Sequence, residues 1–120
     1  MTDKQVTGQN GESLAQQHLS ANGYMILDTN WRYGHLEVDI IALKENTLAF
    51  VEVKTRSSDK INAPEASVNL QKQRNLFRAA NYYVTKHGYG YEVRFDIISI
   101  VQSAQGSRLE HMPDAFSPKW

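Results

Sequence analysis

The sequence contains no cysteine among its 120 residues. This absence excludes disulfide bonds, thiol catalysis and zinc or iron–sulfur sites built on cysteine, and it suits a cytoplasmic protein. No run of about 18 apolar residues is present, so we expect no membrane span. The polar start, Met1 to Gln5, lacks the basic and apolar stretches of a signal peptide, so we expect none.

The sequence also has no excess of charge, because 13 Lys and Arg oppose 13 Asp and Glu. A net charge of zero argues against a protein that coats nucleic acid by charge alone. The distribution is uneven: residues 1–53 hold three basic and seven acidic residues, whereas residues 54–78 hold six and two. Taken alone, this pattern is most simply two ordinary solvated surfaces.

Several functional motifs are missing as well. There is no glycine-rich phosphate loop, nucleophile elbow or dinucleotide fingerprint, so we expect no organic cofactor. The four histidines do not have the spacing of metal ligands. No repeat, low-complexity tract or linker interrupts the chain, and its length suits one domain over residues 1–120.

Hydrophobic periodicity predicts an α/β protein. The expected elements are a helix over 5–22, strands over 24–31, 36–43 and 47–54, a loop over 56–64, a helix over 65–87, a strand over 91–101 and room for a further short strand over 107–112. The strand–helix–strand step around the second helix implies a right-handed parallel crossover. The expected architecture is a mixed sheet flanked by helices, in the order α-β-β-β-α-β.

Periodicity leaves features at both ends of the chain unexplained. Gly8 and Gly11 lie in the first turns of the first helix, where each lowers helix propensity by about 1 kcal/mol relative to Ala. Either that turn frays or small residues are required there. The C-terminal tail carries Phe116 and Trp120, and we expect it to dock on another surface.

The second predicted hairpin contains an unusual set of charged residues. If Glu45-Asn46 forms its turn, residues whose numbers sum to 91 pair across the two strands. Asp39 then lies opposite Glu52, and Glu37 lies opposite Lys54. The two-residue period places these four on one face. It directs four apolar side chains to the other face: Val38, Ile40, Val51 and Val53.

Facing carboxylates repel each other, so Asp39 and Glu52 require compensation by a proton, a cationic side chain or a metal ion. Two carboxylates with the carbonyl of Val53 suit a hard, partly hydrated cation such as Mg²⁺. Lys54 could then orient a bound water or neutralise charge on a phosphate. The alternative is the solvated face of a sheet, with Glu37–Lys54 an ordinary ion pair worth less than about 1 kcal/mol. Both interpretations stay open on these residues.

An Asp on one strand followed by Glu-x-Lys on the next resembles the PD-(D/E)xK nuclease superfamily. The likeness extends from about Gly8 to Phe116 and is greatest to the bacterial YraN family of uncharacterised proteins, which is similar to archaeal Holliday junction resolvases. The matching positions are Gly11-Glu12, Ala15, Leu19, Gly23-Tyr24, Asn30, Arg32, Glu37, Asp39, Phe50 through Arg56, Lys72, Arg94-Phe95-Asp96 and Ala115-Phe116. One departure is Leu36, where the family usually has glycine.

The resemblance implies a restriction-endonuclease-like fold and a metal-dependent endonuclease of DNA, with branched DNA as a candidate substrate. It implies Asp39 and Glu52 as ligands of Mg²⁺ or Mn²⁺, Lys54 as the catalytic lysine and Glu12 as an additional acid of the site. Without the resemblance, Glu12 would be an ordinary acid near a helix N-terminus. The similar resolvases also suggest a homodimer, with two sites related by two-fold symmetry.

A phosphodiester substrate also requires positive side chains around the site. The candidates are Arg32, Arg56, Lys72 and Arg74. Asp96 is expected to make a structural ion pair or to cap a buried network. The alternative functions are a nucleic-acid-binding or partner-binding module that keeps the fold without catalysis, and an interaction protein that uses the tail around Phe116.

Overall fold

The computed structural model describes residues 3–57, 68–87 and 90–118. Its elements are α1 (Asp3–Ala21), β1 (Met25–Tyr33), β2 (Leu36–Lys44), β3 (Thr47–Ser57), α2 (Leu70–His87), β4 (Glu92–Ser103) and β5 (Gly106–Phe116). This order confirms the predicted α/β class and is consistent with a restriction-endonuclease-like fold. In the part of the chain that is described, no helix is long and apolar enough to cross a membrane.

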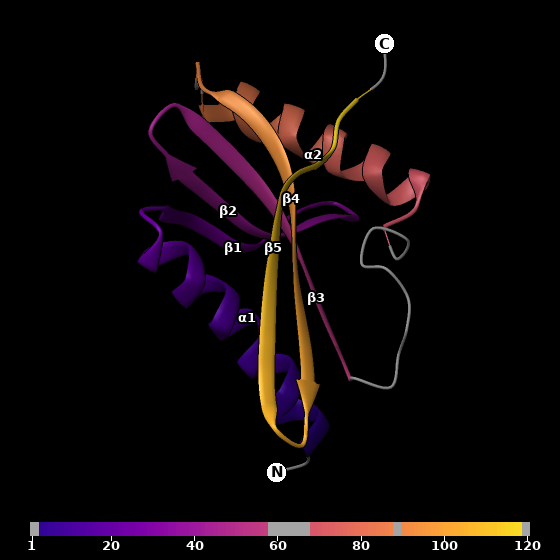
Figure 1. Ribbon diagram of the computed structural model, residues 1–120. Coiled ribbons are helices and arrows are strands. Elements are labelled where there is room, and N and C mark those ends of the chain that lie inside the picture. The colour runs from indigo at the N-terminus through magenta and orange to yellow at the C-terminus, as the bar shows by residue number, and fades with distance from the viewer. Residues whose placement is uncertain (1–2, 58–67, 88–89, 119–120) are drawn as a thin grey trace.

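The five strands form one mixed sheet in the order β1-β2-β3-β4-β5. Of these five strands, β3 and β4 pair in parallel and α2 lies between them in the chain, which confirms the parallel pairing of the predicted crossover. The two helices lie on opposite faces of the sheet (Figure 1). On the α2 face the core includes Phe50, Leu76 and Tyr83. On the α1 face it includes Ala15, Leu19 and Ile98.

The hairpin of β2 and β3 turns at Glu45-Asn46, where Glu45 adopts a φ of 54°. Its register runs from Ile40 opposite Val51 to Lys44 opposite Thr47, which confirms the predicted pairing over these residues. The predicted alternation of faces fails at Val38. Its side chain lies in the α2-side cluster, whereas Ile40 lies in the α1-side cluster. The strand therefore turns over at Asp39.

The neighbouring strand has an irregularity at the same level. In the ladder of β1 and β2, Thr29 pairs with Ile40 and Trp31 pairs with Val38, so Asn30 lies opposite Asp39. Asn30 has a φ of 50°, a left-handed conformation that Asn tolerates better than most residues. Both β1 and β2 are thus irregular at this level, and Asp39 lies outside the regular pairing of the β2–β3 hairpin.

The second helix begins later than predicted. Val68 and Asn69 are not helical, and α2 starts at Leu70 because the Asn69 side chain caps it: Lys72 N donates to Asn69 Oδ1 at 2.9 Å. The predicted start at Pro64-Glu65 lies outside the described residues. The predicted loop is also wrong at its first two residues, because Arg56 and Ser57 belong to β3.

The last strand is longer than the predicted 107–112, since β5 runs from Gly106 to Phe116. Phe116 pairs with Phe95 across the sheet, with ring centroids 5.8 Å apart, and also contacts Phe77 of α2. This part of the predicted docking tail therefore covers the protein's own core. Trp120 lies outside the described residues.

A charged network lies on the α1 side of the sheet. Asp96 is fully buried and accepts two hydrogen bonds of 2.8 Å from Arg94, which confirms the predicted structural ion pair. His111 Nε2 also donates to Asp96 at 2.8 Å, and Asp114 N donates at 3.1 Å. Burial raises the pKa of Asp96, but these hydrogen bonds outweigh burial and lower it overall.

Replacing Asp96 by Ala is expected to destabilise the protein by about 3–5 kcal/mol, because Arg94 would lose its buried partner. Urea unfolding at neutral pH measures this change. The stability that Asp96 gives the wild-type protein should also disappear as pH falls below the ordinary carboxyl range. A carboxyl group with a lowered pKa stabilises the fold only while it is ionised. The matched control is Glu37→Ala, which removes the exposed pair with Arg32 and should cost less than about 1 kcal/mol. Equal losses in the two variants would contradict this account.

Helix α1 contacts the sheet most closely at Gly11. A Cβ built on Gly11 would overlap Oγ1 of Thr55 on β3. Helix α1 runs through this glycine without interruption, so close approach to β3, rather than fraying at this position, explains the residue. The neighbouring residue, Glu12, is thereby held beside β3.

Gly11→Ala should therefore destabilise the protein by about 1–3 kcal/mol through overpacking, although Ala is the better helix former. Thermal and urea unfolding of the single variant, of Thr55→Ala and of the double variant form a double-mutant cycle. The double variant should recover most of the stability lost by Gly11→Ala. A stabilised Gly11→Ala protein would show that no close contact constrains this position.

Candidate functional site

Asp39 lies where β2 separates from β3. The paired register ends at Ile40 and Val51, and beyond it the Asp39 side chain takes the place of a backbone acceptor. Val53 N donates to Asp39 Oδ2 at 2.8 Å. A buried N–H must find a partner, so this hydrogen bond allows the strands to part without leaving Val53 unsatisfied. We call this place, between Asp39 and Val53, the fork.

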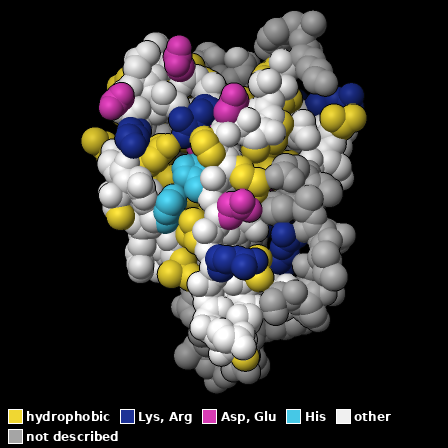
Figure 2. Space-filling view, viewed as in Figure 1, with side chains coloured by type: hydrophobic (Ala, Val, Ile, Leu, Met, Phe, Trp, Pro, Cys, Tyr) yellow, Lys and Arg dark blue, Asp and Glu magenta, His cyan; other side chains and the backbone are white. Residues whose placement is uncertain are grey.

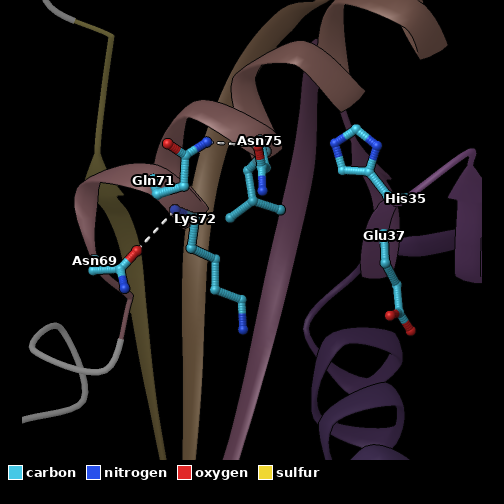
Figure 3. Close-up of a pocket in the computed structure, with 7 residues that line it drawn as sticks. His35, Glu37, Asn69, Gln71, Lys72 and Asn75 are labelled. Carbon is cyan, nitrogen blue, oxygen red and sulfur yellow. Dashed lines mark hydrogen bonds between the residues drawn. The ribbon is translucent and has the colours of Figure 1, made fainter.

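A second carboxylate lies next to the fork. Glu52 is only 6% exposed, and its Oε1 is 2.8 Å from Lys72 Nζ and 3.6 Å from Lys54 Nζ. Lys72 extends from α2 toward the sheet (Figure 3). The site thus combines side chains of β2, β3 and α2, and Lys72 is the cation that directly balances Glu52.

Glu12 approaches the fork from the opposite face of the sheet. Its Oε2 accepts a hydrogen bond of 3.4 Å from Asn30 Nδ2, and its charge raises the pKa of Asp39. Asn30 is among the positions that match the family resemblance, but the sequence assigned it no role at the site. The signal that could have found it is the left-handed tendency of Asn within a predicted strand.

The electrostatics of the site differ from those of a solvated sheet surface. Burial, followed by the charge of Glu52, raises the pKa of Asp39 to about 7, although the Val53 N–H opposes the shift. Burial and the contact with Lys72 lower the pKa of Lys54. Burial also acts to lower the pKa of Lys72, but its bonds to Glu52 and Lys54 raise it overall. Burial first and the charge of Glu52 second therefore determine the pKa of Asp39, and the opposing effects of the Val53 N–H and Lys72 do not cancel them.

The structure separates other predicted site residues. Glu37 pairs with Arg32, at 3.5 Å, so the predicted pairing of Glu37 with Lys54 is wrong: β2 has already turned toward β1. The Arg32 side chain is 70% exposed.

The remaining two cations occupy different places. Arg56 follows Lys54 on β3, and its Nε is buried without a hydrogen-bond partner within the described structure. Arg74 is exposed and lies two residues beyond Lys72 on α2, so the two side chains leave the helix in different directions. The structure does not bring Arg74 to the fork.

The donor atoms at the fork suit a hard cation. The N–H and C=O of a strand residue point toward the same neighbouring strand, so the Val53 carbonyl is expected to face Asp39 as its N–H does. Two carboxylates and a carbonyl are donors that Mg²⁺ accepts while keeping several waters. No group of three or more His, Cys, Asp or Glu residues positioned to hold a metal occurs in residues 3–57, 68–87 and 90–118. Any ion here would therefore depend on water or substrate for its other ligands.

Fold and site together define an α/β protein with paired carboxylates and lysines at the parting of two strands. The profile of the uncharacterised protein family UPF0102 matches residues 11–100. A UPF0102 protein of Parabacteroides distasonis is 44% identical over 109 residues, which cover 91% of this chain and 90% of the relative. A UPF0102 protein of Bacteroides thetaiotaomicron is 42% identical over 98% of each chain. The chain belongs to the UPF0102 family, which is the YraN family.

The raised pKa of Asp39 predicts a stability that falls with pH. Between its ordinary value of 3.8 and about 7, folded Asp39 binds a proton that the unfolded chain has released, so the free energy of unfolding decreases as pH rises through this window. The slope is at most about 1.4 kcal/mol per pH unit. Above the window the contribution is constant.

Asp39→Asn should remove this dependence, because its amide oxygen still accepts from Val53 N but carries no charge. Urea unfolding of both proteins at about pH 5 and about pH 8 should show a larger loss for the wild type. Parallel changes in the two proteins would mean that Asp39 does not titrate abnormally.

Proposed function

We propose that this protein is a metal-dependent endonuclease that hydrolyses phosphodiester bonds in DNA, with its active site at the fork. The observation that carries the proposal is the convergence of Asp39, buried Glu52 and Lys54 at one place in the sheet. A charge cluster of this kind is costly to bury and is typical of functional sites. The resemblance to PD-(D/E)xK nucleases supports the same assignment of residues.

Asp39, Glu52 and the Val53 carbonyl would hold Mg²⁺ or Mn²⁺, with Glu12 supporting the site through its charge. Such an ion, when bound, supplies Lewis-acid polarisation of the phosphate and a more acidic water. Lys54 Nζ would position the attacking water or stabilise negative charge on the phosphate oxygens. Lys72 would hold the Glu52 carboxylate in place through their 2.8 Å ion pair.

The substrate strand would be held by cations around the fork. Arg56 offers the unpaired Nε donor and Arg32 an exposed guanidinium, whereas Arg74 could contact phosphates only away from the fork. Figure 2 shows one face on which basic, acidic and histidine side chains are interspersed with apolar ones. A two-fold dimer would present two such sites to two DNA strands.

A second candidate is a catalytically silent nucleic-acid-binding module with the same fold. The observation in its favour is the 2.8 Å pair of Lys72 with Glu52, because it neutralises one carboxylate with a side chain of the protein itself. In that case the role of the charged cluster would be to fasten α2 to the sheet, and it would not bind a metal ion.

Cleavage assays with Mg²⁺ or Mn²⁺ on single-stranded, duplex, flap and four-way-junction DNA test the proposal. The wild type should cleave at least one substrate, and Asp39→Asn should cleave none. Lys54→Met should lose about 10²–10³-fold in kcat, the cost of removing one group that stabilises transition-state charge.

The matched control is Glu110→Gln, which removes an exposed carboxylate of β5 and should leave cleavage unchanged. Binding of DNA without cleavage by the wild type, unaffected by Asp39→Asn, would favour the silent module. Cleavage that survives in Asp39→Asn would reject the fork as the active site.

A further inference from the structure

A cleft of about 350 Å³ opens beside the fork, between the start of β2 and the first turns of α2. Figure 3 shows its polar lining, which consists of His35, Glu37, Asn69, Gln71, Lys72 and Asn75. Lys72 belongs to both places, because it lines the cleft and also contacts Glu52. A ligand in the cleft would therefore lie next to the candidate active site.

The lining of the cleft is rich in amides. Asn69 Oδ1 caps α2, and Gln71 Nε2 donates to Asn75 Oδ1 at 3.1 Å. The other amide groups of these three side chains are donors and acceptors of the kind that hydrogen-bond the edges of nucleobases. The floor includes buried Leu76, which offers an apolar surface. Glu37 is the one acid of the lining, and its pairing with Arg32 offsets its charge.

An aromatic pair continues from the cleft along the same side of α2. Tyr33, at the end of β1, stacks on Tyr82 of α2 with ring centroids 4.1 Å apart and planes 26° apart. Both stay exposed, at 50% and 43%. Trp31 continues the stack behind Tyr33, at 6.5 Å and 15°. Tyr33 thus has a ring on each side, so Tyr82, at the end of the stack, is the ring on which an unpaired base can stack.

Helix geometry connects these features into one strip. Gln71, Asn75, Arg78 and Tyr82 are three or four residues apart in sequence, so they follow one another on a single face of α2. From Asn69 to Tyr82 the helix advances about 20 Å. We call this surface the strip. It runs from the lysine at the fork past the amides of the cleft and an exposed arginine to the stacked tyrosines, and its residues are Lys72, Asn69, Gln71, Asn75, Arg78, Tyr82 and Tyr33. Cations and aromatic rings together are the elements of surfaces that bind single strands.

We propose that this strip binds unpaired bases of the DNA strand whose phosphodiester lies at the fork, so that the preferred substrates contain a single-stranded segment. The inference rests on the proposed nuclease function for the position of the scissile bond. A fully paired duplex would bury its bases and could not stack one on Tyr82. Flaps and single strands are therefore preferred over blunt duplexes and over four-way junctions with fully paired arms.

Binding to a labelled oligothymidine of about 10 nucleotides, measured by fluorescence anisotropy in EDTA, tests the strip without any cleavage. The wild type should bind this strand more tightly than a blunt duplex of equal length. Tyr82→Ala should weaken binding about 5- to 100-fold, the typical loss for one base–aromatic stack, and Tyr33→Ala, which removes the ring that supports Tyr82, should weaken it less. Tyr33→Phe and Tyr82→Phe keep the rings and should bind as the wild type does.

The matched control is Val93→Ala. Val93 is 41% exposed, a fraction similar to that of Tyr82, but it lies on β4 and is not part of the strip. It should leave binding unchanged. Thermal melting of every variant identifies any that fails to fold, and the Phe variants then still separate stacking from stability. Equal affinity of the wild type for single strand and duplex, or alanine variants that fold and bind normally, would overturn the inference.

Two further outcomes separate this inference from the nuclease proposal. Asp39→Asn should bind the single strand at least as tightly as the wild type, since it removes only a negative charge. Tyrosine-dependent binding with no cleavage of any substrate would support the strip and reject the nuclease. Metal-dependent cleavage of duplex that ignores both tyrosines would support the nuclease and reject the strip.

Discussion

The hydrogen bond from Val53 N to Asp39 Oδ2 is the interaction on which the candidate site depends. A sheet ordinarily satisfies each strand N–H with the carbonyl of its neighbour. Here a side chain provides the acceptor, so β2 can leave β3 while the backbone of β3 stays paired. Strands that part in this way leave room for polar groups in the middle of an otherwise apolar sheet.

The surrounding residues offset part of the cost of burying charge there. Lys72 pairs with Glu52 from α2, and Lys54 lies nearby on β3. Within the part of the chain that the structure describes, no ion pair of Asp39 with a cation occurs, and burial and Glu52 dominate its pKa. By contrast, buried Asp96 holds a bidentate arginine, a histidine and a backbone N–H. Among the described residues, buried Asp96 is thus fully compensated, whereas the half-buried Asp39 is not, and Asp39 lies at the proposed active site.

Much of the fold could be predicted from the sequence because the relevant signals are local. The Glu45-Asn46 turn fixed the register of β2 and β3, and alternating apolar residues gave the strands. Two predictions of the fold were wrong for different reasons, the first through a distant strand and the second through a local cap that hydrophobic periodicity does not show. Val38 changes face because β1 twists at Asn30, and α2 starts late because Asn69 caps it. The charged residues of the fork were predicted as neighbours, but the bond between Asp39 and Val53 required knowledge of where the strands part.

Elsewhere in the molecule, the sheet and its two apolar clusters separate α1 from α2. The fork is different, since Asp39 responds both to Glu12 on α1 and to Lys72 on α2. At the fork, charged side chains from both faces of the sheet therefore interact with the same carboxylate. Any change of charge at the fork alters the electrostatic free energy of both helices at once. The docking of α1 and the docking of α2 are thus thermodynamically linked through a single carboxylate, although the helices lie on opposite faces.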